Sequence, residues 1–473
     1  MASYDASFAD AVPPVALGAL DGRYRPVVAA LVDHLSEAAL NRTRVHVEVE
    51  WLIHLTDQQV VPGVRRLTAT EQQALREYVR GFGAEEVAEL AEIERETVHD
   101  VKAVEYFLKR RLAVVAPEDV DRGLAELVHF ACTSEDVNNL SYALMVQGAV
   151  REVWLPKAHA VADQVVAMAQ ELRDVPMLAH THGQPATPTT LGKELAVLAH
   201  RLRRQLRRVA GAEYLGKLNG ATGTYGAHLA AVPDADWPAV SRSFVESLGL
   251  TWNPLTTQIE SHDWQAELYA DVARFNRVLH NLCTDVWTYI SMGYFAQVRG
   301  QGTVGSSTMP HKVNPIRFEN AEANLEVSNA LLDVLGSTLV QSRLQRDLTD
   351  SSMQRNIGSA FGHSLLALDN VGRGLAGLDA VPSAMAADLD RNWEVLGEAV
   401  QSAMRALAAR GVAGMDNPYE RLKELTRGRR IDGEDLRAFV DGLGLPVDVA
   451  ARLRAMTPAS YVGAAPALVD FLE

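Results

Sequence analysis

Long, uninterrupted helical periodicity is the feature of this sequence that most restricts its fold. Between Asp263 and Met292 there is no proline or glycine, and apolar residues recur at every third or fourth position. This spacing places the apolar side chains on one face of a helix. A helix of roughly 30 residues is about 45 Å long, which exceeds the width of a compact domain. The sequence therefore predicts a bundle of long helices.

Two further stretches repeat the pattern. Residues 191–209 carry apolar side chains at the same spacing, and Thr187-Pro188 before them is typical of a helix start. A third helix is predicted from about Asn320 to Leu348. Alternation with a period of two is scarce, so any sheet should be minor. We expect an all-α fold, with an elongated central helical bundle flanked by two smaller helical domains.

The chain divides into three predicted parts. We expect an N-terminal helical domain over residues 1–120, a central long-helix bundle over 121–370 and a C-terminal helical domain over 371–473. The stretch GLDAVPSAMAADLD marks the second boundary. Helices as long as those of the central part have apolar faces to spare, which suggests burial against other subunits.

Composition and charge exclude several classes of protein. The chain is 48% hydrophobic and 22% charged, and its net charge of −15 argues against a nucleic-acid-binding surface. Cys132 and Cys283 are too few for a disulfide framework or a cysteine-based zinc site. No apolar run approaches the roughly 18 residues of a membrane span, and the N-terminus does not resemble a signal peptide. We therefore expect a cytoplasmic protein.

Four polar stretches interrupt the helices, and one of them, HFACTSEDVNNLSY, has the spacing of a helix start. Thr133 and Asp136 match a capping box, so a helix N-terminus is the simpler interpretation. The exposed N–H groups and the hydroxyls of Thr133 and Ser134 could also hold a carboxylate. That second interpretation requires Glu135 and Asp136 to point away.

Histidines stand in two more of these stretches. In HDVKAVEYFLKRR, His99 precedes Asp100, a pair more typical of a helix surface or core than of catalysis. In HTHGQPATPTT, His180 and His182 alternate before Gly183. Alternate histidines can ligate a metal, but no third ligand of suitable spacing lies nearby, and we predict no metal site. A catalytic imidazole and a loop histidine that caps backbone groups both stay open.

The fourth stretch, RGQGTVGSSTMPHKVNP, crowds two serines, a histidine, a lysine and an asparagine among glycines and prolines. It lacks the spacing of a phosphate loop and the Gly-x-Ser-x-Gly pattern of a nucleophile elbow. A solvated surface loop is the usual interpretation of a glycine-rich stretch. The density of hydrogen-bonding groups instead favours an active-site lid, with glycines at 300, 302 and 305 providing freedom to close.

GSSTMPHKVNP, residues 305–315, resembles the defining motif of the fumarase/aspartase superfamily, whose members eliminate fumarate from succinyl compounds. The histidine at position 311 of this motif resembles the adenylosuccinate lyase branch of the superfamily. The resemblance to the longer bacterial form of that branch extends over nearly the whole chain. The similar stretches are ALDGRYRP, HDVKAVEYFLK, HFACTSEDVNNLSYALM, THGQPATPTTLGKE, NPLTTQIESHDW and SRLQRDLTDSSMQRN. Two positions depart: Val98 stands where a polar nucleotide-binding residue is expected, and Arg317 where an acid is expected.

The resemblance implies cleavage of adenylosuccinate to AMP and fumarate, and the same β-elimination on succinylaminoimidazole carboxamide ribotide in purine synthesis. It implies that Ser306 is the base, activated beside Lys312 once the lid has shut, and that His182 is the general acid supported by His99. No cofactor or metal is implied. By the same resemblance, the residues that bind substrate are Arg23, Tyr24, His99, Asp100, Thr133, Ser134, Gln258, Ser307, Lys312, Asn314, Asn320, Arg346, Ser351 and Arg355.

These positions run from residue 23 to residue 355, on elements that a bundle of long helices would hold far apart. The resemblance implies a homotetramer whose sites form where three subunits meet. Three alternatives remain: another lyase or cycloisomerase of the superfamily, such as carboxymuconate cycloisomerase; a catalytically silent structural protein; and an α-helical binding module. Intact His182, Ser306 and Lys312 favour an enzyme, and Arg23-Tyr24 favours a nucleotide substrate.

Overall fold

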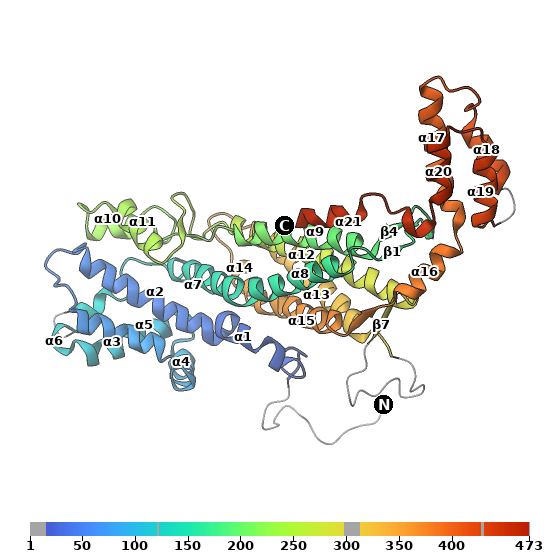
Figure 1. The fold of residues 1–473 in the computed structure, drawn as a ribbon. Helices are drawn as coiled ribbons and strands as arrows, with labels where there is room; N and C mark the ends of the chain where they lie inside the picture. The colour runs from blue at the N-terminus through green and yellow to red at the C-terminus, as the bar shows by residue number, and fades with distance from the viewer. Residues whose placement is uncertain (1–15, 121–122, 298–312, 427–429, 473) are drawn as a thin grey trace, which may run out of the picture. The chain divides into compact units, whose positions relative to one another are not determined.

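The structure is a computed structural model that describes residues 16–120, 123–297, 313–426 and 430–472 (Figure 1). The residues group by their packing into two compact units. Unit 1 comprises Met1–Ala158, Gln205–Arg277 and Ala323–Asp369, and unit 2 comprises His159–Arg204, Val278–Glu322 and Asn370–Glu473. The three-part division of the sequence at residues 120 and 370 stays a prediction.

Helices make up most of the described chain, which confirms the predicted all-α fold. The longest stretch of helical periodicity forms α12, Asp263–Ser291, as predicted. Its apolar residues at three- and four-residue spacing, such as Trp264, Leu268 and Val272, are buried. Within the described ranges, no helix combines the length and the apolar character that crossing a membrane requires.

The boundaries of two helices, α9 and α13, differ from the prediction. α9 begins at Leu191 and ends at Ala210, because the residues after Thr187-Pro188 form the short strand β4, Thr189–Thr190. The hydroxyl of Thr190 accepts the N–H of Lys193 (3.2 Å) and takes the capping role that we assigned to Thr187. α13, Ile316–Leu339, ends nine residues before Leu348. The left-handed backbone of Leu344 (φ 54°) would itself prevent a helix from continuing to Leu348.

In unit 1, α2, α3, α4 and α5 pack around one apolar core, which includes Val49, Leu75, Leu90 and Phe107 (Figure 1). α2 also packs along α7. The elements that lie wholly in unit 1 are α1 (Arg25–Leu35), α2 (Glu37–Asp57), α3 (Ala69–Arg80), α4 (Ala84–Thr97), α5 (Asp100–Val115), α6 (Pro117–Val120), η1 (Leu124–Leu127), α7 (Ser134–Gly148), η2 (Ala149–Trp154), β5 (Leu215–Gly216), α10 (Gly226–Ala231), α11 (Trp237–Ser247), β6 (Thr251–Trp252) and α14 (Thr349–Gln354).

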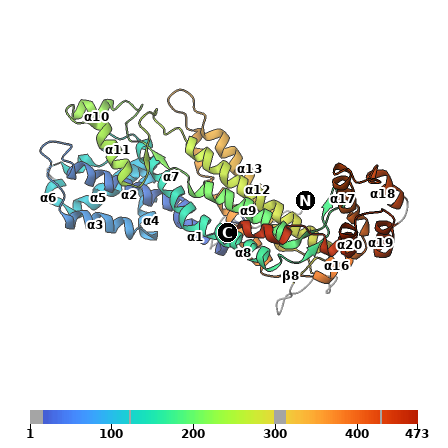
Figure 2. The ribbon, with the colours of Figure 1, turned by 45° about the horizontal axis from the view of Figure 1, so that its top comes forward.

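In unit 2, α17, α18, α19 and α20 pack together around a core that includes Val400, Met404 and Leu436 (Figure 2). The elements that lie wholly in unit 2 are β1 (Pro176–Met177), β2 (His180–Thr181), β3 (Gln184–Pro185), β4, β7 (Phe295–Gln297), β8 (Leu378–Ala380), α16 (Pro382–Asp390), η3 (Trp393–Leu396), α17 (Gly397–Ala409), α18 (Pro418–Thr426), α19 (Gly433–Asp441), α20 (Val447–Ala455), η4 (Pro458–Ser460), α21 (Ala465–Leu468) and η5 (Val469–Leu472).

The long helices contribute residues to both units; they are α8 (Leu155–Glu171), α9, α12, α13 and α15 (Ile357–Leu375). Strand pairing in the described residues is limited to two-stranded ladders. β1 with β4, β2 with β3 and β7 with β8 are antiparallel, and β5 with β6 is parallel. The prediction that any sheet is minor is confirmed.

Candidate active site

The start of α7 is the centre of the candidate site in unit 1. The carboxylate of Asp136 accepts the backbone N–H of Thr133 (2.8 Å), so the spacing of these two residues does mark a helix N-terminus. Ser134 is the first helical residue. Glu135 and Asp136 are both buried, and whether an anion can approach this helix start depends on what these two carboxylates contact.

The carboxylate of Asp136 forms a buried ion pair with Lys217. It accepts the ammonium group of Lys217 (2.8 Å) and the backbone N–H groups of Asn219 (2.9 Å) and Gly220 (3.1 Å). The side chains of Asp136 and Lys217 are both fully buried, so each charge is sustained by the other and by the surrounding N–H groups. This ion pair fixes the segment after β5 to the start of α7.

Glu135 has a different cation. Its carboxylate accepts Nη2 of Arg346 (2.8 Å) and Nδ2 of Asn138 (2.8 Å). Burial raises the pKa of the Glu135 carboxyl group, and the neighbouring Arg346 guanidinium only partly offsets this effect. Each acid of the first turn therefore has a cation, although Arg346 also lies 3.7 Å from the buried carboxylate of Asp350. The carboxylate interpretation requires these two acids to point away from the helix start; the structure instead pairs each of them with a cation, and that interpretation stays a prediction.

Arg346 also joins Gln258 to the cluster. Its Nη1 donates to Oε1 of Gln258 (3.2 Å), whose Nε2 donates to the carbonyl of Ala221 (2.9 Å). The Nε of Arg346 is buried and has no hydrogen-bond partner among the described residues. An unpaired buried guanidinium N–H is costly. The Oδ2 of Asp350, whose carboxylate lies 3.7 Å from the same guanidinium, is also buried and has no hydrogen-bond partner among the described residues.

His99 and Asp100 lie at the corner between α4 and α5. Val98 ends α4 with a left-handed backbone (φ 51°), and Nδ1 of His99 accepts the backbone N–H of Lys102 (3.3 Å) at the start of α5. Asp100 accepts Nη2 of Arg44 (2.7 Å). Burial alone would raise the pKa of Asp100, but the Arg44 guanidinium outweighs it, so the pKa is lowered and the carboxylate stays ionised.

Arg355 lies next to this corner, 3.6 Å from Asp100, and its Nη1 donates to the hydroxyl of Ser351 (2.9 Å). It lines a cavity of about 320 Å³ between α1 and α15. Arg23 and Tyr24 precede α1, and the Arg23 guanidinium lies 5.9 Å from the centre of the Tyr24 ring.

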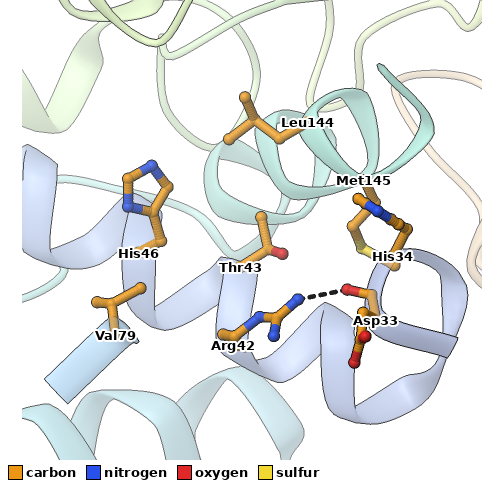
Figure 3. A pocket seen from close by; sticks show the side chains of 8 residues that line it. All are labelled: Asp33, His34, Arg42, Thr43, His46, Val79, Leu144 and Met145. Atoms are coloured by element: carbon orange, nitrogen blue, oxygen red, sulfur yellow. Dashed lines mark hydrogen bonds between the residues drawn. The ribbon is translucent and has the colours of Figure 1, made fainter. Parts of the chain in front are cut away.

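A separate cavity of about 250 Å³ is lined by Arg42 and His46 of α2 and by Leu144 and Met145 of α7 (Figure 3). Arg42 there donates to the backbone carbonyl of Asp33. Successive helical residues are turned by about 100°, so Arg42 points away from the side of α2 that carries Arg44. None of the predicted site residues lines this cavity, and we do not assign the function to it.

His182 belongs to unit 2. With Gly183 it forms the two-residue turn of the β2–β3 hairpin, in which Thr181 pairs with Gln184. Both turn residues have positive φ angles (54° and 71°), as a type I′ turn requires. The imidazole is exposed at the tip of this hairpin. His180, the first residue of β2, is also exposed.

Asn314 and Asn320 also belong to unit 2. Asn314 precedes α13 and is half-buried, while Oδ1 of Asn320 accepts Nδ2 of Asn370 (2.9 Å). Arg317, which departs from the expected acid, donates to the other amide atom, Oδ1 of Asn370 (3.2 Å). Ser306, Ser307 and Lys312 lie outside the described residues. Among the residues that are described, no group of three or more His, Cys, Asp or Glu could hold a metal ion.

Sequence reasoning missed Arg44, Asn138 and the pair of His129 with Glu48. Arg44 and Glu48 are four residues apart on α2, each directly before a buried valine (Val45 and Val49), and both are themselves buried. That spacing is the signal that could have found them, because a charged residue on a buried helix face needs a partner. His129 lies four residues before Thr133, and its backbone N–H donates to Glu48 (3.0 Å).

The His129–Glu48 pair predicts a pH-dependent stability. Burial alone would lower the pKa of His129, but the Glu48 carboxylate raises it above the ordinary 6.5. The stabilisation from the charged pair is therefore complete below about pH 6.5 and is lost as the pH rises through the higher pKa of the folded protein. We expect Glu48→Gln to lower the melting temperature more at about pH 6 than at about pH 9.

Glu71→Gln is the matched control for this prediction. Glu71 pairs with Arg65 (2.9 Å), and neither group titrates between pH 6 and pH 9. Its effect on the melting temperature should be equal at the two pH values. Equal effects for Glu48→Gln would show that His129 carries no extra charge at the lower pH.

Comparisons with known proteins extend over almost the whole chain. The family model described as lyase matches residues 22–328, and the model described as adenylosuccinate lyase C-terminal matches residues 342–462. The adenylosuccinate lyase of Escherichia coli strain K12 is 49% identical over 97% of this chain and 98% of its own length. That of Vibrio cholerae serotype O1 is 48% identical, with the same two shares.

Solved structures show the same fold. A fumarate lyase from Mesorhizobium sp. BNC1 superimposes with a TM-score of 0.73 at 19% identity, over 100% of this chain and 99% of its own. The 3-carboxy-cis,cis-muconate lactonizing enzyme from Pseudomonas putida gives 0.70 at 21% identity, over 94% and 96% of the two chains.

Proposed function

The chain belongs to the adenylosuccinate lyase family, and we propose that the cluster around the start of α7 is part of its substrate site. The protein is a C–N lyase that cleaves adenylosuccinate to AMP and fumarate by β-elimination. The same elimination on succinylaminoimidazole carboxamide ribotide gives aminoimidazole carboxamide ribotide. The observation that carries this conclusion is the near full-length similarity to adenylosuccinate lyases. The muconate enzyme shares too little sequence to support more than a common fold.

The reaction needs a base, an acid and fixed donors. Removing a proton next to a carboxylate produces an aci-carboxylate that carries two negative charges, which aligned donors in a site closed to water stabilise. The proposal assigns the base to Ser306, the succinyl contacts to Ser307, Lys312, Asn314 and Asn320, and the general acid to His182. The roles of Ser306, Ser307, Lys312 and Asn314 rest on the motif GSSTMPHKVNP, and that of His182 rests on the stretch THGQPATPTTLGKE. The role of Asn320 rests on the wider resemblance alone.

The start of α7 is the proposed binding site for a substrate carboxylate. Its first N–H groups carry partial positive charge, and the hydroxyls of Thr133 and Ser134 stand at the same place. Support comes from the pairing of Glu135 with Arg346 and of Asp136 with Lys217, which balances the two acidic charges of the first turn.

The nucleotide is proposed to bind along the cationic residues of unit 1. Gln258 and Arg346 lie in the same cluster, and the unpaired Nε of Arg346 supports an anionic ligand there. Arg355, whose Nη1 donates to the hydroxyl of Ser351, lines a cavity of about 320 Å³, which is large enough for a phosphate group. Arg23 and Tyr24 complete the proposed set. His99 is proposed to support the general acid or the phosphate; because its Nδ1 caps α5, its Nε2 would make that contact.

A homotetramer with shared sites is the proposed assembly. On α13, Ala323, Val327, Ala330 and Val334 are exposed at alternating spacings of four and three residues. That spacing is typical of a helix that packs against another helix along a seam. A second copy of this chain could cover such an apolar stripe, which supports the proposal. A cytoplasmic location is part of the same proposal.

A spectrophotometric assay on both succinyl substrates tests the proposed function. We expect purified protein to release fumarate from adenylosuccinate, with AMP as the second product, and from the ribotide substrate as well. If it turns over carboxymuconate instead and leaves adenylosuccinate unchanged, the assignment is wrong. A protein that turns over none of these substrates would favour a structural role.

A further inference from the structure

We infer that Arg44, Asn138 and Glu135 form a positioning chain, which sets the relative orientation of two parts of the substrate site. One part is the His99–Asp100 corner, and the other is the Gln258–Arg346 pair. The inference rests on the proposed function, because it assigns a role to residues that support the proposed binding groups. The three residues of this positioning chain are buried and lie in unit 1.

The first half of the positioning chain begins at Asp100. Arg44 donates through Nη2 to Asp100 (2.7 Å), through Nε to Oδ1 of Asn138 (2.9 Å) and through Nη1 to Asn41 (3.0 Å). Each nitrogen of the Arg44 guanidinium therefore has an acceptor, although its side chain is only 2% exposed. A planar guanidinium with three occupied nitrogens holds its partners in a fixed geometry.

The second half continues from Asn138. Its Nδ2 donates to Oε1 of Glu135 (2.8 Å), and the same oxygen accepts Nη2 of Arg346 (2.8 Å). Arg346 in turn donates to Gln258 (3.2 Å). An unbroken path of hydrogen bonds thus joins Asp100 to Gln258, two residues that are distant in sequence.

Asn138 can join the two halves in only one orientation. An arginine offers only donors and an ionised carboxylate offers only acceptors, so the amide oxygen must face Arg44 and the amide nitrogen must face Glu135. Replacing a buried ionic network with apolar residues of similar volume often costs little or stabilises a fold. Orientation of the binding groups is therefore the role that best accounts for these buried charges.

Asn138→Leu tests the inference, because leucine has a similar volume and can neither accept from Arg44 nor donate to Glu135. We expect the KM for adenylosuccinate to rise by about tenfold while kcat changes by less than about threefold, since the proton-transfer groups are untouched. The affinity for AMP, measured by calorimetry, should fall by a similar factor. An unchanged KM and an unchanged AMP affinity would overturn the inference.

Asn276→Leu is the matched control. Asn276 is a fully buried asparagine of α12 that donates to Ser328 (3.1 Å) and accepts from Ser364 (2.8 Å). Its loss should lower the melting temperature without raising KM. If both leucine variants raise KM equally, the effect of Asn138 is general destabilisation and the inference is wrong.

A double-mutant cycle gives a second readout that general destabilisation would not change. We expect Asp100→Asn and Arg346→Lys to be non-additive in kcat/KM, because the positioning chain couples them. In the Asn138→Leu background the two changes should become additive. Coupling that persists in this background would contradict the inference. A wild-type protein that releases no fumarate would overturn the proposed function itself, and the inference with it.

Discussion

Replacing His182 by alanine is expected to lower kcat for adenylosuccinate cleavage by about 10²–10⁴-fold, the usual contribution of a general acid. The proposed role of the imidazole is to protonate the departing nitrogen, so its loss should affect the transition state and leave KM nearly unchanged. Ser306→Ala is expected to reduce kcat at least as far, because it removes the proposed base. Steady-state measurement of fumarate release checks both variants.

His180→Ala is the matched control for this experiment. His180 is two residues from His182 on the same hairpin and is also exposed, but no role in the reaction is assigned to it. Its alanine variant should keep nearly wild-type kcat. A His182→Ala protein with wild-type activity, or an equally damaged His180→Ala protein, would remove His182 from the mechanism.

Local spacing explains which features could be predicted from sequence alone. The periodicity between Asp263 and Met292 predicts α12 almost residue by residue, because apolar spacing reports directly on which helix face is buried. The capping box of Thr133 and Asp136 needs only three residues of context. The start of α9 was placed too early, because a threonine-proline pair can also precede a strand, as it does before β4.

Contacts between distant residues explain what could not be predicted. Asp136 binds Lys217, which is 81 residues away, and Glu135 binds Arg346, which is 211 residues away. No local pattern indicates which cation will meet which acid, because the fold brings them together. In the sequence, the two adjacent acids argue against a carboxylate bound at the helix start. In the structure each of the two acids has a cation, which no local pattern in the sequence indicates.

The division of the proposed catalytic residues leads to the second large expected effect. Glu135 and Gln258 both contact Arg346 in unit 1, whereas His182 belongs to unit 2 and Ser306 lies outside the described residues. If each site takes its acid and its base from different subunits, inactive variants can complement each other. Co-assembly of His182→Ala with Ser306→Ala should then restore activity far above that of either variant alone.

Random mixing in a tetramer sets the size of this recovery. A site that needs one intact residue from each of two subunits is complete in about one case in four, so activity should approach a quarter of the wild-type value. The control is a protein that carries both substitutions, mixed with either single variant. Such mixtures contain only one of the two intact residues, so they can build no complete site and should stay inactive. An affinity tag on one of the single variants would show whether mixed tetramers form. If they form and remain inactive, each site takes both residues from one subunit.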